Sequence, residues 1–230
     1  VPTAFWGGQA AAQNQATEIE PIGAGDIVVT AQRREQRIND IGMSISALSS
    51  DDLAARGINT VADLGRAVPG FSFTQSDVNV PVYTLRGVGY NETSLAASPA
   101  VSVYVDEVAL PYPAMTAGPQ FDLERVEVVK GPQGTLYGQN STGGAINYVA
   151  RKPGDRLEFG GSLGYGRFNR FTGEGYVSTP LSPTLKIRVA VKGETGDSWQ
   201  RSLTRDDRLG RISRLGGRLL LDWQATPGAK

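Results

Sequence analysis

The sequence of 230 residues contains no cysteine and no histidine. These absences exclude disulfide frameworks, thiol nucleophiles, cysteine-based zinc sites and every catalytic triad that depends on a histidine. Neither sign of charge is in excess, because 23 Lys and Arg residues balance 23 Asp and Glu residues. A protein held to nucleic acid mainly through its phosphates needs a basic excess, so the composition argues against nucleic-acid binding.

Long hydrophobic runs are also missing. No window of 18 apolar residues occurs, which excludes a transmembrane helix. A membrane role stays open, because a transmembrane β-strand needs only about 9–11 alternating residues. Glycine, by contrast, is abundant, with 29 residues. Many short apolar runs separated by glycine are typical of a β-rich protein.

Residues 7–25 are rich in Gly, Ala, Gln, Asn and Pro and have few large apolar side chains. Such a segment buries too little surface to offset its ordering entropy, so we interpret residues 1–25 as a flexible tether. Residues 1–12 fit either the end of a signal peptide, with cleavage after Ala12, or a disordered tail. A short β-branched run with the sequence DIVVTA follows at residues 26–31.

Residues 38–150 show a mixed helical and extended pattern. Residues 50–57 predict a short helix with Ser50 as its cap, and residues 60–69 predict a second with Thr60 as its cap. The glycine-rich segment 131–144 has no lysine after its glycines, as a phosphate-binding loop would have. We therefore interpret its glycines as turn residues. Four apolar runs predict strands; they are residues 82–85, 101–108, 126–130 and 145–149.

After residue 153 apolar and polar residues mostly alternate in four segments, of which the second is the weakest: residues 157–166, 171–181, 185–192 and 215–223. Alternation fits a soluble sheet packed on one face, which base rates favour, or a membrane barrel with its apolar face toward lipid. Two features favour the barrel. The polar face carries mid-strand charges that suit a wet lumen, and the last connectors alternate between short and long. The charges belong to Lys186, Arg188, Lys192 and Arg218.

The run FDLERVEVVKGPQGTLYG at residues 121–138, continued by QNSTGGAIN to residue 147, closely resembles the plug domain of TonB-dependent outer-membrane transporters. LRGVG at residues 85–89 and SVYVDEV at residues 102–108 match the same family in order and spacing. The run DIVVTA resembles its TonB box. The resemblance covers about residue 26 to the end of the chain.

The resemblance implies an α+β plug domain followed by antiparallel transmembrane β-barrel strands. A plugged barrel of this class has about 22 strands, whereas four are visible, so we expect an incomplete barrel. The expected organisation is a tether at 1–25, the TonB box and a linker at 26–37, the plug at 38–152 and the first four barrel strands at 153–230.

The implied function is TonB-dependent active import of a scarce solute, such as an iron–siderophore, across the bacterial outer membrane, with the plug gating the lumen. No bond is made or broken, so we expect no enzyme activity, no cofactor and no resident metal. The implied partners are outer-membrane lipid, the periplasmic protein TonB and a small-molecule or metal-chelate substrate. The whole protein is expected to be a monomer with its plug and N-terminus toward the periplasm.

Three groups of site residues follow from the resemblance. An extended box on a leash suits strand addition to TonB. Arg86 and Arg125 are expected to pair with glutamates on the inner barrel wall and lock the plug. Tyr90, Asn91 and Tyr112 are candidate substrate contacts, although ordinary loop residues explain them equally well. The residues assigned to TonB binding are Asp26, Ile27, Val28, Val29, Thr30 and Ala31.

Two alternatives to import follow from the sequence. One is a soluble periplasmic binding or adhesion module whose sheet only resembles barrel strands. The other is a hydrolase that uses the acid pair Asp106 and Glu107. Adjacent residues of a strand point to opposite faces, so this pair cannot flank one bond, which excludes the hydrolase.

Overall fold

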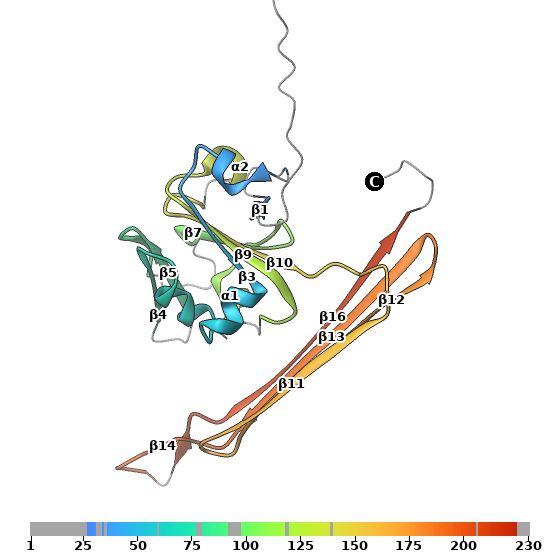
Figure 1. The fold of residues 1–230 in the computed structure, drawn as a ribbon. Coiled ribbons are helices and arrows are strands. Elements are labelled where there is room, and N and C mark those ends of the chain that lie inside the picture. Colours follow the sequence, from blue (N-terminus) through green and yellow to red (C-terminus); the bar gives the residue numbers. More distant parts are fainter. Residues whose placement is uncertain are drawn as a thin grey trace, which may run out of the picture.

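The computed structural model describes residues 27–30, 34, 36–58, 60–76, 80–91, 98–117, 120–138, 140–205 and 207–224. These residues form a globular body and, after it, a long antiparallel sheet that lies along one side of the body (Figure 1). Residues 151–157 link the last strand of the body to the first strand of the sheet. No helix in the described part of the chain has the length and apolar composition needed to cross a membrane.

The body is built around a five-stranded sheet with the order β3-β9-β10-β7-β8. β10 pairs antiparallel with β9 and parallel with β7. Every residue of β10 is buried, because apolar clusters cover both faces of the sheet. The strands are β3 (Ile45–Ser49), β7 (Val101–Val105), β8 (Val108–Leu110), β9 (Leu123–Lys130) and β10 (Gly144–Ala150).

Smaller elements complete the body. A three-stranded sheet contributes Phe71, Tyr83 and Leu85 to the larger of the two clusters. Five short helices connect or flank the strands. These elements are β4 (Phe71–Gln75), β5 (Pro81–Leu85) and β6 (Val88–Gly89), with η1 (Ile38–Asp40), α1 (Ser50–Ala55), η2 (Val61–Arg66), η3 (Pro113–Ala117) and α2 (Gly134–Tyr137).

Several local predictions need correction. The cap of α1 is Ser49 rather than Ser50, since the Ser49 hydroxyl accepts from the Asp52 backbone N–H at 3.1 Å. The second predicted helix is the 3₁₀ helix η2, shorter than expected. The predicted strand at residues 101–108 is interrupted by a turn at Asp106 and Glu107, both with positive φ. The hydrolase was excluded because adjacent strand residues point to opposite faces. This reason does not apply, because Asp106 and Glu107 lie in a turn.

The second unit is a four-stranded antiparallel sheet with the order β11-β12-β13-β16, as the alternation predicted. Its connectors are tight except for residues 197–211, which carry the small hairpin of β14 (Gln200–Arg201) and β15 (Arg208–Leu209). The long strands are β11 (Glu158–Gly166), β12 (Arg170–Ser182), β13 (Leu185–Gly196) and β16 (Ile212–Trp223).

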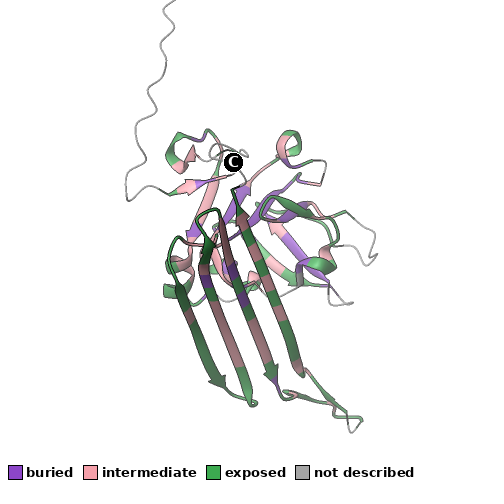
Figure 2. Ribbon diagram, turned by 90° about the vertical axis from the view of Figure 1, so that its right-hand side faces the viewer, coloured by how far each residue is buried: buried purple, intermediate pink, exposed green. Residues whose placement is uncertain are grey.

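The two faces of this sheet differ sharply in exposure. Leu163 is 94% exposed and Leu215 is 85% exposed, whereas Ala190 on the face toward the body is 1% exposed. Figure 2 shows exposed and less exposed residues alternating along these strands, with the buried strands of the body behind them. The outer face is therefore apolar and uncovered in the described structure. Its large side chains include Phe159, Leu163, Tyr165, Phe171, Val177, Val189, Val191, Leu215, Leu219, Leu221 and Trp223.

Candidate functional site

The predicted TonB box lies against the body. Asp26 and Ala31 fall outside the described residues, whereas Ile27 to Thr30 are described. The strand β1 (Val28–Val29) pairs antiparallel with β2 (Gln36–Arg37), and the backbone N–H of Ile38 donates to the carbonyl of Ile27 at 2.9 Å. The first part of the box thus forms a short hairpin with the segment that follows it.

Val29 anchors this hairpin in the body. Its side chain is completely buried in the smaller apolar cluster. Burying a valine contributes about 1.5–3 kcal/mol relative to leaving it exposed. The buried members of this cluster are Val29, Ile41, Tyr104, Val129, Tyr137 and Ala145.

Thr30 is bonded to a buried carboxylate. Its backbone N–H donates to Oε1 of Glu127 at 2.8 Å, and its hydroxyl lies 3.2 Å and 3.3 Å from the two carboxylate oxygens. The Glu127 side chain is completely buried in the middle of β9 and also accepts from Nε of Arg125 at 2.7 Å. A buried charge needs such partners, because an unpaired one is costly to desolvate.

The two arginines of the predicted lock have different surroundings. Arg125 pairs with Glu124 and Glu127 of its own strand. Arg86 donates to Oγ of Ser44 at 2.6 Å. Among the described residues, no carboxylate forms an ion pair with Arg86 or with Lys130. Burial, together with the charge of Arg86, lowers the pKa of Lys130. The body thus presents two neighbouring cations at Arg86 and Lys130. Pairing of Arg86 and Arg125 with barrel glutamates stays a prediction.

A buried ion pair joins the sheet to the body. Nε and Nη2 of Arg188 on β13 donate to the two carboxylate oxygens of Asp122 at 2.7 Å and 2.5 Å. The side chains are 1% and 4% exposed. The guanidinium also lies 4.1 Å from the ring centroid of Tyr176. This bidentate geometry is the strong form of an arginine–carboxylate contact.

Two more cations of the sheet bind the backbone beside Asp122. Lys192 donates to the carbonyl of Gln120 at 3.0 Å, and Nη1 of Arg218 donates to the carbonyl of Phe121 at 3.0 Å. The backbone N–H of Asp122 in turn donates to Glu174 at 2.9 Å. We call this set, residues 120–122 of the body with Glu174, Arg188, Lys192 and Arg218 of the sheet, the wall contact.

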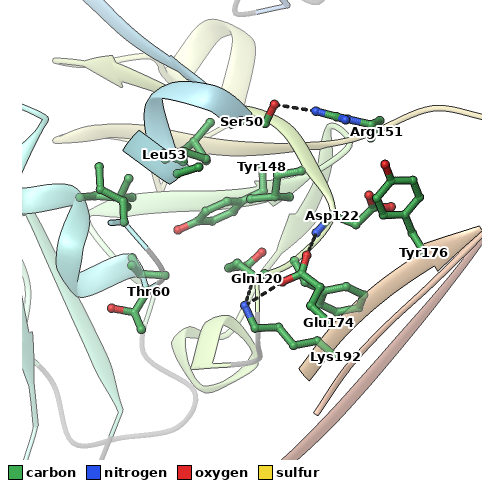
Figure 3. Close-up of a pocket in the computed structure, with 17 residues that line it drawn as sticks. Ser50, Leu53, Thr60, Gln120, Asp122, Tyr148, Arg151, Glu174, Tyr176 and Lys192 are labelled. Atoms are coloured by element: carbon green, nitrogen blue, oxygen red, sulfur yellow. Dashed lines mark hydrogen bonds and ion pairs between the residues drawn. The ribbon is translucent and has the colours of Figure 1, made fainter. Parts of the chain in front are cut away.

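A cavity of 260 Å³ lies beside the wall contact, between the helical side of the body and the sheet. Figure 3 shows Lys192, Glu174 and Asp122 on its polar side and Leu53 and Tyr148 on the opposite side. The Tyr148 hydroxyl is buried without a hydrogen-bond partner. Its burial raises the pKa of the phenol well above its ordinary value.

The candidate substrate contacts lie on exposed loops. Tyr90 and Asn91 follow β6, and Tyr112 lies between β8 and η3. β6 and β8 belong to different sheets. Their role in binding stays a prediction. No group of three or more metal-binding side chains occurs among the residues that the structure describes.

Sequence reasoning missed Glu127 and Asp122. Glu127 could have been found from the sequence, because it is a single acid within a valine-rich run. Such a run predicts a strand that is covered on both faces, where a carboxylate is shielded from water and needs a bonding partner. The cations at positions 188, 192 and 218 were recognised as an unusual polar face but were assigned to lumen water. Their partner is instead the body.

A globular body bonded to the polar face of an antiparallel sheet, whose other face is apolar, is the arrangement expected of a plug against a barrel wall. Residues 37–145 match the family of TonB-dependent receptor plug domains. This part of the chain belongs to that family, and the chain carries the plug domain of a TonB-dependent receptor. Below, residues 36–152 are called the plug and β11, β12, β13 and β16 the wall.

Two proteins from other bacteria are similar to much of the chain. The iron-regulated outer membrane virulence protein of Vibrio cholerae is 30% identical over 207 residues, which cover 77% of this chain and 30% of that protein. The pesticin receptor of Yersinia pestis is 33% identical over 129 residues, covering 55% of this chain and 19% of the receptor. The chain therefore spans less than a third of the length of these relatives.

Solved structures agree with this assignment. The ferric yersiniabactin uptake receptor of Yersinia pestis superposes with a TM-score of 0.67 at 28% identity, covering 78% of this chain and 28% of that one. The ferripyoverdine receptor of Pseudomonas aeruginosa, also with a TM-score of 0.67, covers 87% of this chain and 26% of that one. At 22% identity, the latter likeness supports the plug-and-barrel fold alone.

Proposed function

We propose that this chain is part of a transporter that imports an iron chelate of the siderophore class across the outer membrane. Three of the proteins named above have names that refer to iron, namely the iron-regulated virulence protein, the ferric yersiniabactin uptake receptor and the ferripyoverdine receptor, which supports this substrate class. In this proposal the wall continues into a closed barrel whose lumen is blocked by the plug. The plug and the N-terminus face the periplasm.

The proposal rests on one observation: the plug holds the predicted box by a few contacts and is itself bonded to the wall through the wall contact. The box segment is short, β-prone and held at the plug surface by a two-residue ladder, one buried side chain and Thr30. A short segment held by so few contacts is suited to leave as a unit and to add as a strand to TonB. The plug itself is bonded to the polar face of the wall.

We further propose that the plug lock uses Arg86 and its neighbour Lys130. Both are cations, and neither forms an ion pair with a carboxylate among the described residues. Two adjacent positive charges repel each other. Carboxylates on the remaining barrel wall would pair with Arg86 and Lys130 and offset this repulsion. Arg125 already has two carboxylates and is the weaker member of the original pair.

The exposed outer face argues against the soluble module. Eleven large apolar side chains lie exposed on this one face of the sheet. Such a face is unusual on a water-soluble monomer, where continuous apolar patches rarely exceed a few hundred Å². A lipid contact accounts for the face without a further protein partner. Nothing in the described structure specifically favours the soluble module.

Replacement of Val28 by proline tests the proposal. Proline removes a ladder donor and disfavours an added strand, so transport of the ferric chelate should be abolished while chelate binding at the cell surface stays nearly intact. The measurement is uptake and surface binding of radiolabelled chelate in cells that carry the complete protein. Ile27→Val at the neighbouring position is the control and should transport normally. Unchanged transport by the proline variant would show that the box is misassigned.

A further inference from the structure

The buried carboxylate of Glu127 has no task in the proposed import function as stated so far. It lies in the middle of β9, where both neighbouring strands are paired and no water reaches the side chain. Its bonding partners are Arg125 of the same strand and Thr30 of the predicted box. Glu127 therefore connects the plug core to the segment that is expected to leave it.

We propose that Glu127 is the latch that holds the TonB box on the plug and keeps it from pairing with TonB. This inference rests on the proposed function, because it assigns a regulatory contact to the box. The latch is the set of bonds that join the Glu127 carboxylate to the backbone N–H and hydroxyl of Thr30.

The latch blocks strand addition for a geometric reason. Backbone groups of an extended segment alternate between its two edges. Ile27 and Thr30 are three residues apart, so their backbone groups belong to opposite edges. The carbonyl of Ile27 is occupied by Ile38, and the N–H of Thr30 is occupied by Glu127. Both edges of the box are thus engaged, and a partner strand needs at least one of them free.

A carboxylate suits a latch better than an apolar contact alone. Hydrogen bonds to a charged group in a buried place contribute more than neutral ones, so the docked state is favoured strongly over partial opening. When the box departs, Arg125 remains bonded to Glu127 and keeps the charge compensated. Asn147, which faces Glu127 across the β9–β10 ladder, also lies 3.5 Å from the Thr30 hydroxyl. The docking site therefore persists and can receive the box again.

The test measures how often the box leaves the plug. Val29 is completely buried when the box is docked, so the thiol of a Val29→Cys variant reacts with a water-soluble maleimide only from the undocked state. The experiment uses the complete protein in lipid nanodiscs, in a background without other cysteines. Adding Glu127→Ala should increase the labelling rate about tenfold to a hundredfold, as loss of hydrogen bonds to a charged group predicts.

Two further variants keep the test decisive. Glu124→Ala removes the other carboxylate partner of Arg125 without touching Thr30 and should leave the labelling rate unchanged. Thr30→Val removes only the hydroxyl contacts and should give a smaller increase than Glu127→Ala. If Glu127→Ala prevents folding of the plug, as thermal unfolding would reveal, Thr30→Val decides the outcome. In that case, equal labelling rates in Thr30→Val, in Glu124→Ala and in the parent protein would overturn the latch.

Failure of the latch and failure of the proposed function are distinguishable. The labelling rate concerns the box and the plug alone, whereas binding of the purified periplasmic domain of TonB is a separate measurement. A variant that is labelled faster but does not bind TonB keeps the latch and rejects the box assignment. Unchanged labelling rejects the latch whether or not TonB binds.

Discussion

The plug and the wall are both built on β-strands, yet they bury opposite kinds of surface. In the plug, β10 is buried along its whole length because protein covers both faces. In the wall, β16 alternates between partly buried and exposed residues, and the exposed ones are mostly large and apolar. Strand chemistry alone therefore does not determine the environment. The environment depends on what covers the other face of each sheet. For the wall, the uncovered apolar face is the kind that contacts lipid.

Buried charged groups join the box and the wall to the plug, and Val29 adds an apolar anchor to the box. The box is bonded to Glu127, and the wall is bonded to Asp122 through Arg188. Polar interfaces can open and be hydrated, whereas opening an apolar core exposes surface that water disfavours. Under the proposed function, such contacts suit a plug that stays seated at rest and moves during transport.

The largest effect is expected from breaking the buried ion pair between the two regions. Arg188→Ala leaves the Asp122 carboxylate buried without its cation, which should cost about 3–5 kcal/mol of plug stability. Lys186→Ala is the matched control on the same strand, because its partner Asp155 is 84% exposed, and it should leave the stability nearly unchanged. Urea titration of the complete protein in detergent gives both values. Equal costs would mean that the wall contact does not hold the plug.

The next effect distinguishes the two faces of the wall. Leu163→Lys places a charge on the outer face of β11. If this position lies near the midplane of the bilayer, the charge should cost about 2–4 kcal/mol of folding free energy. Ser162→Lys, the adjacent residue on the opposite face, should cost less, because its side chain points to the polar face of the sheet. Folding of the complete protein into vesicles measures both. A smaller cost at position 163 than at position 162 would reverse the assignment of the faces.

The smallest effect concerns the cavity between the plug and the wall. The Tyr148 hydroxyl is buried without a partner, and such a group costs about 1–3 kcal/mol. Tyr148→Phe removes it and should therefore stabilise the plug by about 1 kcal/mol. Thermal or urea unfolding of the complete protein checks this gain. A loss of stability would show that water in the cavity bonds the hydroxyl in solution.

The sequence was sufficient for the alternation of the wall strands and for the family, because both depend on local patterns and motifs. It was insufficient for β3 and β4, whose Ser- and Thr-containing runs are weakly apolar and become strands only by pairing with β9 and β5. The wall contact was also out of reach. Asp122 and Arg188 are 66 residues apart, and only the folded chain brings them together.

Asp106 and Glu107 show a further limit of local patterns. They stand inside an apolar β-prone run, which predicts one continuous strand. The chain turns there instead, because Asp106 accepts a hydrogen bond from the backbone N–H of Ala150 at 2.7 Å and both residues adopt positive φ. A side chain that bonds distant backbone can therefore override a strand pattern.

The most direct test of the account is the environment of three consecutive residues on β13. Single cysteines at Val189, Ala190 and Val191 would be labelled with a fluorophore in the complete protein, folded in vesicles that contain brominated lipid. Strong quenching by the lipid is expected at positions 189 and 191, and little at 190, which faces the plug. Absence of lipid quenching at all three positions would contradict the account, since the wall would then lie in water.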